Sequence, residues 1–307
     1  MINEYAVEPS IVSSWERLQR ILSQFGFDKS RLIARVPGKW QMAVLDGLPT
    51  ALPDHERSKI VARLRDFEDL VCVPRKHDWS KARTWLENVK AIHVDDPFTL
   101  ILTAIGEQIS LPIVPYTELD ESNPPQGWIV SGRVERRKEA MAKALRMVLQ
   151  SARRFVRFVD PHFHPLTPRF LAPMTEYLQS IRTVRDRSTY PEIQIHTSNE
   201  QVPKAFTEQC NEKLKGLLPI GTQLTVVRWP HQKLHNRYIL TEKAGVLLGT
   251  GTDENHKGTD GKEHDLFKLL NAVERQELVE EYDLAGSRLG TPDPKNGDIF
   301  VIVGTRR

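Results

Sequence analysis

The chain has 307 residues, of which 39% are hydrophobic and 27% are charged, shares that exclude a fibrous chain and a largely disordered one. The formal net charge is only +3, so the total does not identify a nucleic-acid binder and the distribution of charge must decide. Cys72 and Cys210 are the only cysteines, which excludes a disulfide framework and a cysteine zinc site.

The first part of the sequence predicts a mainly helical N-terminal module, residues 1–125, whose role is not indicated. Apolar residues recur at helical spacing in three segments, residues 8–27, 58–71 and 78–93. Short strand-like pieces at 31–36 and 70–75 leave an α+β module open as an alternative. The stretch 116–128 is acidic and carries a Pro pair, a composition typical of a linker, so we place the domain boundary after residue 125.

From residue 126 onward, strands alternate with helices. Strands are expected at residues 155–160, 192–197, 222–229, 237–241, 245–250 and 298–304. Helices are expected at residues 132–154, 168–184, 204–218 and 270–285. This alternation predicts an α/β domain, residues 126–307, with a mixed, largely parallel sheet flanked by helices and a hairpin near its end.

No export signal is visible in the sequence. The first ten residues lack the basic start and the apolar run of an export signal. The most apolar stretch, residues 97–106, is too short to cross a bilayer as a helix. We therefore expect a cytoplasmic protein with no transmembrane insertion.

Polar residues gather on the predicted hairpin that starts at residue 235. Side chains alternate along a strand, so His235 and Arg237 project to the same side, as a phosphate clamp requires. Glu242 follows in the turn, and Gly249 with Thr250 ends the second strand, where a glycine permits close approach of the backbone to a phosphate. An ordinary hairpin with solvent-facing polar residues is the alternative interpretation.

The spacing of these residues resembles the histidine-lysine-aspartate motif of the phospholipase D superfamily, with Arg237 and Glu242 in place of the lysine and the aspartate. Asp160 and Pro161, followed about seventy residues later by His235 and then by Gly249, Gly251 and Asp253, resemble the single-motif branch of that superfamily. That branch includes domains of bacterial conflict and defence proteins and the C-terminal domain of MIT-domain proteins.

The resemblance implies a phospholipase-D-like fold and a metal-independent phosphodiesterase, a nuclease of a bacterial defence system that acts through a phosphohistidine. His235, Arg237 and Glu242 would be the catalytic residues, and phosphate would be held by Gly249, Thr250, Gly251 and Thr252. No cofactor or metal is expected, and partner proteins from a defence operon are implied. The alternative is an inactive module of the same fold that binds nucleic acid, anionic lipid or a protein partner.

The implied chemistry needs a second histidine. A homodimer could bring two copies of His235 together across a twofold axis, and we favour this arrangement. His162 and His164, at the end of a predicted strand, are the candidates within one chain.

Basic residues are concentrated between residues 131 and 158. Nine Lys and Arg residues stand there against two acids, and this predicts contacts with nucleic acid. The candidate contact residues are Arg133, Arg136, Arg137, Lys138, Arg153 and Arg154. A solvated helix face balanced by acids from elsewhere is the alternative. Trp229 is a further candidate, as a platform for a base, although a tryptophan in a strand is commonly part of the core.

Overall fold

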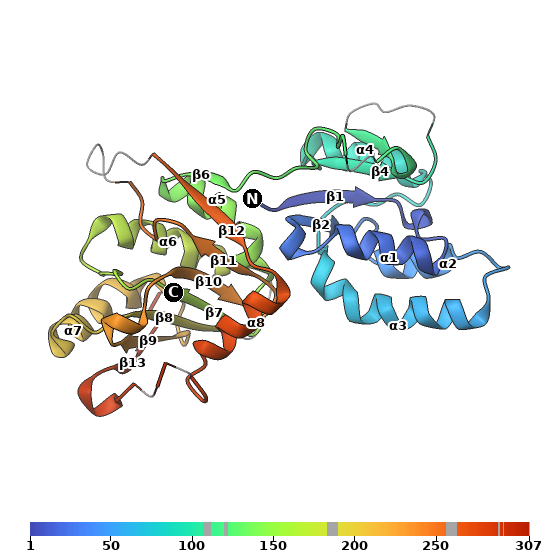
Figure 1. Cartoon of the computed structure of the whole chain (residues 1–307). Coiled ribbons are helices and arrows are strands. Elements are labelled where there is room, and N and C mark those ends of the chain that lie inside the picture. The colour runs from blue at the N-terminus through green and yellow to red at the C-terminus, as the bar shows by residue number, and fades with distance from the viewer. Residues whose placement is uncertain are drawn as a thin grey trace. The chain divides into compact units, whose positions relative to one another are not determined.

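The chain folds into two compact units, which are described separately (Figure 1). The computed structural model describes residues 1–106, 112–119, 122–182, 190–255, 263–287, 289–290 and 292–306. The N-terminal domain is Ile2–Ser131 and the C-terminal domain is Gly132–Arg307. The boundary therefore lies between Ser131 and Gly132, slightly beyond the predicted position after residue 125.

The N-terminal domain is an α/β domain, so the prediction of a mainly helical module is wrong. Its strands, all parallel, lie in the order β3-β2-β1-β4-β5. The strands are β1 Asn3–Val7, β2 Arg31–Ala34, β3 Cys72–Val73, β4 Leu100–Thr103 and β5 Ile113–Pro115. The helices are α1 Trp15–Gln24, α2 Trp40–Asp46, α3 Asp54–Val71 and α4 Trp85–Asp95, with short 3-10 turns at η1 Pro9–Ile11, η2 Phe27–Lys29 and η3 Tyr116–Glu118.

Helices cover both faces of this sheet. Neighbouring residues of a strand point to opposite sides, so each strand supplies side chains to the core on either face. Tyr5 and Val7 of β1 pack in a core with Leu18 of α1 and with Leu64 of α3. Ala6, between them, packs in a second core with residues of α4. Figure 1 shows α1 and α3 on one side of the strands and α4 on the other.

The C-terminal domain is built on a mixed sheet in the order β13-β9-β8-β7-β10-β11-β12-β6. Its strands are β6 Arg133–Glu135, β7 Phe155–Val159, β8 Glu192–Ser198, β9 Gln223–Trp229, β10 Arg237–Thr241, β11 Gly245–Leu248, β12 His264–Leu269 and β13 Ile299–Val303. Its helices are α5 Lys138–Ser151, α6 Pro168–Arg182, α7 Pro203–Leu214 and α8 Ala272–Glu281, with 3-10 turns at η4 Lys215–Leu217, η5 His231–Lys233 and η6 Pro294–Asn296.

The predicted helices and strands of this domain are present, and two strands were not predicted. Only β7, β8 and β9 pair in parallel, and the other neighbours in the sheet pair antiparallel, so the sheet is mixed rather than largely parallel. The unpredicted strands are β6 and β12, which pair with each other at one edge. The start of β12 lies in the polar stretch 253–265, of which residues 256–262 lie outside the described residues.

The two faces of this sheet are also covered by helices. Phe158 of β7 stacks on Tyr177 of α6, with ring centres 6.0 Å apart. Val159, the next residue, packs in a core with Tyr238, Leu240 and residues of α8. Asp160, two residues after Phe158, therefore lies on the same face of the sheet as Phe158, the face that α6 covers. No helix among the described residues is long and apolar enough to cross a membrane.

Candidate functional site

Several chain segments meet at one end of the strands of the C-terminal sheet, the end at which β7 stops and β10 starts. The strand β10 runs antiparallel to β7, with Tyr238 opposite Val159, so the start of β10 lies beside the end of β7. The strand β11 runs antiparallel to β10, with Leu248 opposite Arg237, so β11 stops at the same end of the sheet. The sequence 235–253 and the Asp160 segment are brought together in this way.

A pocket of about 190 Å³ lies at this end of the sheet. Its lining side chains come from the ends of β6, β7 and β11, from the start of β10 and from the first turn of α6. The lining residues are Arg136, Asp160, His162, Arg169, Phe170, Arg237, Thr250 and Asp253.

Of the three arginines that line the pocket, Arg237 alone forms no ion pair with a carboxylate of the described residues. Tyr238 and Leu240 face the core beneath α8, so alternation along β10 directs Arg237 to the opposite face, where Asp160 lies. The Arg237 Nε atom is buried and has no hydrogen-bond partner among the described residues. A buried donor without a partner is unfavourable, so a bound anion would stabilise this arrangement.

The other two arginines of the pocket share one carboxylate. Nη2 of Arg136 lies 3.1 Å from Oδ2 of Asp253, and Nε of Arg169 lies 3.5 Å from the same oxygen. The Arg136 side chain is only 2% exposed. Burial raises the pKa of the Asp253 carboxyl, and the charges of Arg136 and Arg169 oppose this rise. Asp253 is thus a structural counter-ion that fixes two cations at the pocket wall.

Asp160 holds the turn that follows β11. Its Oδ2 accepts hydrogen bonds from the backbone N–H of Thr252 at 2.8 Å and from the Thr252 hydroxyl at 2.7 Å. Its Oδ1 accepts the backbone N–H of His162 at 2.9 Å. Gly251 has φ +147°, and a Cβ there would lie 2.7 Å from Oδ1 of Asp253 and 3.2 Å from Oδ2 of Asp160. Only glycine fits this close approach of the turn to the two carboxylates.

Asp265 fixes the same turn from the other side, a role that the sequence did not indicate. Its Oδ2 accepts the backbone N–H of Thr250 at 2.9 Å, and a Cβ at Gly249 would lie 2.6 Å from its Oδ1. Asp265 belongs to β12, fifteen residues after Thr250, and no local pattern marks this pairing. Thr250 is thereby held at the pocket, whereas the hydroxyl of Thr252 is already used by Asp160.

The charges of the pocket favour an anion. Three guanidinium groups and two carboxylates line it, which leaves one positive charge in excess when His162 is neutral. Guanidinium groups bind phosphate through paired, charge-assisted hydrogen bonds.

Two of the three predicted catalytic residues are not part of this pocket. His235 is exposed, just before β10, and does not line it. Glu242 lies at the other end of β10, where its carboxylate accepts the backbone N–H groups of Arg153 and Arg154 at 2.7 and 3.2 Å. The prediction of Glu242 as a catalytic residue beside Arg237 is therefore corrected: Glu242 caps the start of the β7 segment.

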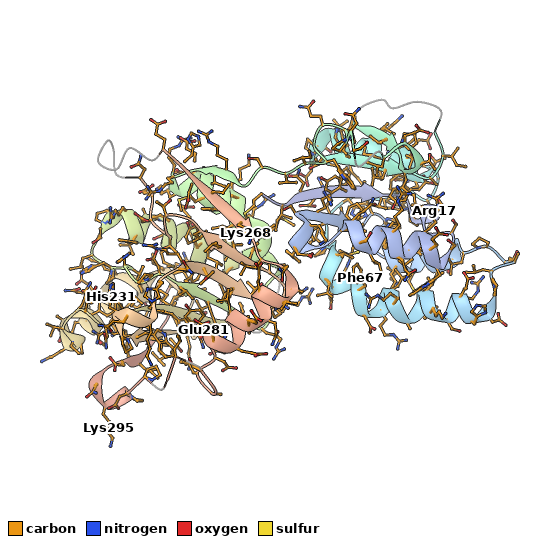
Figure 2. All side chains as sticks on the ribbon, in the orientation of Figure 1. Arg17, Phe67, His231, Lys268, Glu281 and Lys295 are labelled. Carbon is orange, nitrogen blue, oxygen red and sulfur yellow. The ribbon has the colours of Figure 1, made fainter. Side chains whose placement is uncertain are left out.

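The two histidines predicted as alternatives are separated by the structure. His162 lines the pocket and is exposed. His164 does not line it, and its ring packs edge-on against Phe206, 6.3 Å between ring centres. His231 of η5, labelled in Figure 2, lies with its ring centre 6.1 Å from that of His162 and its Nδ1 3.5 Å from Oε2 of Glu200.

The predicted nucleic-acid contact residues are divided between the two ends of helix α5. Arg133, Arg137 and Lys138 lie near Arg136 at the start of α5, while Arg153 and Arg154 lie past its end, beside Glu242. Arg137 also pairs with Glu135, Nε to Oε1 at 2.5 Å. The residues therefore do not form one continuous track.

Trp229 belongs to the core and not to a binding surface. It is 1% exposed, and its Nε1 donates a hydrogen bond to Nδ1 of His196 at 2.9 Å. Burial, together with a smaller contribution from the charge of Arg157, lowers the pKa of His196 to about 3. The neutral His196 ring is thus a structural acceptor.

Among the described residues, no group of three or more His, Cys, Asp or Glu side chains is placed to hold a metal ion.

No family model and no curated protein matches this chain. Among solved structures, it is similar to a chain described as TrmBL2, an archaeal chromatin protein with a novel mode of DNA binding. The identity is 11% and the TM-score 0.25, and the match covers 48% of this chain and 46% of that chain. The match thus spans about half of each chain, and no conclusion about fold or function follows from it.

Proposed function

We propose that the C-terminal domain binds a phosphate group of nucleic acid in the pocket at Arg237, and that the domain is a single-motif relative of the phospholipase D superfamily. One observation carries the proposal: the Arg237 guanidinium faces a pocket with excess positive charge and forms no ion pair with any described residue.

The pocket has the size and the donors for one phosphate group. Its volume of about 190 Å³ is below the range of roughly 300–1,000 Å³ that is usual for whole small ligands. A phosphate would sit inside, with the rest of the ligand outside. Arg237 would donate two parallel hydrogen bonds to it, and the Thr250 hydroxyl, held in place through Asp265, would donate another.

Nucleic acid is the ligand that the surroundings favour. The exposed residues Arg133 and Arg137 lie on the segment that contains the pocket residue Arg136. Cations outside the pocket can contact the neighbouring phosphates of a polymer, which a monomeric phosphate does not have.

The test is binding of fluorescent single- and double-stranded oligonucleotides, followed by anisotropy with a chelator present. Arg237→Gln removes the positive charge of Arg237, and Arg146→Gln is the matched control, because Arg146 is exposed on α5 and does not line the pocket. We expect Arg237→Gln to weaken binding at least roughly tenfold and to reduce the salt dependence by about one phosphate contact. Equal affinities of the two variants would overturn the proposal.

A second candidate function, a metal-independent phosphodiesterase, is supported by His162 at the pocket. In this reaction one imidazole nitrogen attacks phosphorus, the bond from phosphorus to the leaving oxygen breaks, and a second imidazole gives that oxygen its proton. Water then hydrolyses the phosphohistidine. His162 is the candidate nucleophile, and His231 or the His235 of a second copy is the candidate acid.

Hydrolysis of a chromogenic phosphodiester in the presence of chelator tests this second function. Activity that is lost in His162→Ala and retained in His164→Ala supports it, because His164 lies two residues away without lining the pocket. Activity that is unchanged by His162→Ala contradicts it. The homodimer, the defence setting and the partner proteins stay predictions from the family resemblance.

A further inference from the structure

The N-terminal sheet reverses its direction of winding between β1 and β4. From β1 the chain proceeds to β2 and β3 on one side, and β4 is followed by β5 on the other side. β1 and β4 are parallel neighbours, with Tyr5 opposite Leu100 and Val7 opposite Leu102. In parallel α/β sheets, the carboxyl ends of two such strands open a crevice in which ligands bind.

A pocket of about 520 Å³ lies at this position. Its lining residues follow β1 (Glu8, Ser10, Ile11, Ser13), end and follow β4 (Thr103, Ala104, Ile105), follow β5 (Tyr116, Thr117), and belong to α1 (Arg17) and the start of α4 (Thr84, Trp85, Leu86). Its volume is within the range of roughly 300–1,000 Å³ that is usual for small-molecule sites.

The acid of this pocket is already engaged. Glu8 accepts a hydrogen bond from the Ser10 hydroxyl at 2.7 Å and another from the backbone N–H of Ala104 at 2.8 Å. The Glu8 carboxylate thus ties the end of β1 to the end of β4 and forms a wall of the crevice.

The cation of the pocket has no such partner among the described residues. Arg17, labelled in Figure 2, projects from α1, with its guanidinium 6.0 Å from the centre of the Tyr116 ring. Arg20, one turn along α1, lies 5.6 Å from the same ring. Neither guanidinium forms an ion pair or a hydrogen bond with another described residue. The ring itself is fixed, because the Tyr116 hydroxyl donates to Oε1 of Gln24 at 2.8 Å.

The remaining lining offers a flat apolar wall and hydroxyl groups. The Trp85 ring is half-buried, and its orientation is set by the hydrogen bond from its Nε1 to the carbonyl oxygen of Val36 at 2.9 Å. Ile11 and Leu86 contribute further apolar surface. Ser13 and Thr117 are exposed at the pocket and carry hydroxyl groups that can bond a sugar.

We infer that this crevice binds a nucleoside monophosphate. Its phosphate would lie beside Arg17 and Arg20, its planar base against Trp85, and its ribose hydroxyls near Ser13 and Thr117. The positive charge of Arg17 and Arg20 on α1 favours the phosphate, and the flat face of the Trp85 ring favours an aromatic base. The site belongs to the N-terminal domain, and the inference does not depend on the function proposed for the C-terminal pocket.

The test is calorimetric titration of the full chain with AMP, GMP, CMP and UMP separately, and with adenosine. The variant is Arg17→Gln. Its matched control is Arg63→Gln, because Arg63 is likewise on a helix of the same domain, with its guanidinium 5.4 Å from the Phe67 ring, but does not line the pocket. Arg237→Gln reports whether a nucleotide has bound in the other domain instead.

We expect at least one monophosphate to bind, and Arg17→Gln to weaken that binding roughly tenfold or more. Arg63→Gln and Arg237→Gln should leave it unchanged, and adenosine should bind more weakly than AMP if AMP is the ligand. The inference is overturned if no monophosphate binds, if Arg17→Gln has no effect, or if binding is lost in Arg237→Gln and kept in Arg17→Gln.

Discussion

Replacing Asp160 with asparagine tests how the turn after β11 is held at the pocket. In the wild-type protein, the Asp160 side chain is almost fully buried, and it accepts three hydrogen bonds from Thr252 and His162. In Asp160→Asn, the amide oxygen can still accept the N–H of His162, but the amide NH₂ then faces the N–H of Thr252. A buried N–H without an acceptor costs about 1–3 kcal/mol, and a charged acceptor is lost in addition.

We therefore expect Asp160→Asn to lower the free energy of unfolding of the C-terminal domain by roughly 2–4 kcal/mol. Hydrogen exchange of peptides from β7 and β10 in increasing urea measures this domain separately from the N-terminal one. Glu277→Gln, an exposed acid-to-amide change on α8, is the control and should have almost no effect. A loss below about 0.5 kcal/mol for Asp160→Asn would refute the assignment of Asp160 as the residue that holds this turn.

Three further predictions concern neighbouring features. Gly251→Ala places a Cβ 2.7 Å from Oδ1 of Asp253 at a residue with φ +147°. It should lower the free energy of unfolding by more than Gly221→Ala does, because Gly221 has φ +79° but open space around it. Equal losses of this free energy in urea unfolding would contradict the prediction. The pKa of His196 is about 3 in the folded chain and 6.5 ordinarily, so between these values only the unfolded chain binds this proton. The free energy of unfolding should therefore fall as the pH decreases from about 6.5. Urea unfolding across this pH range should show a weaker dependence of that free energy on pH in His196→Gln. Glu242→Ala should lower thermal stability and leave oligonucleotide affinity unchanged, and a large loss of affinity would restore Glu242 to the binding site.

The sequence predicted the elements of the C-terminal domain better than those of the N-terminal one, for a physical reason. Helix α5 has a clear apolar face, and β8 is seven residues long. In the N-terminal domain, β1 has five residues and β4 four, and parallel strands covered on both faces lack the alternation that marks a strand. Such short apolar runs are not distinguishable from parts of helices by their period.

The pocket was predicted in part. Arg237 and Thr250 lie in adjacent strand segments, so local spacing was sufficient to place them together. Arg169 and Asp265 come from α6 and β12, and their contacts with Asp253 and Thr250 arise only from the tertiary fold. Glu242 was wrongly included because it matched the spacing of the motif, although the five-residue strand β10 separates it from the pocket.

The most direct test of phosphate binding at Arg237 is the response of the Arg237 side chain itself to a phosphodiester. In ¹⁵N NMR spectra, the Nε–H signal of Arg237 can be assigned from its loss in Arg237→Lys. We expect this signal to shift and to saturate when a dinucleotide is added in the presence of chelator. A signal that does not move while the dinucleotide binds elsewhere on the protein would contradict phosphate binding at Arg237.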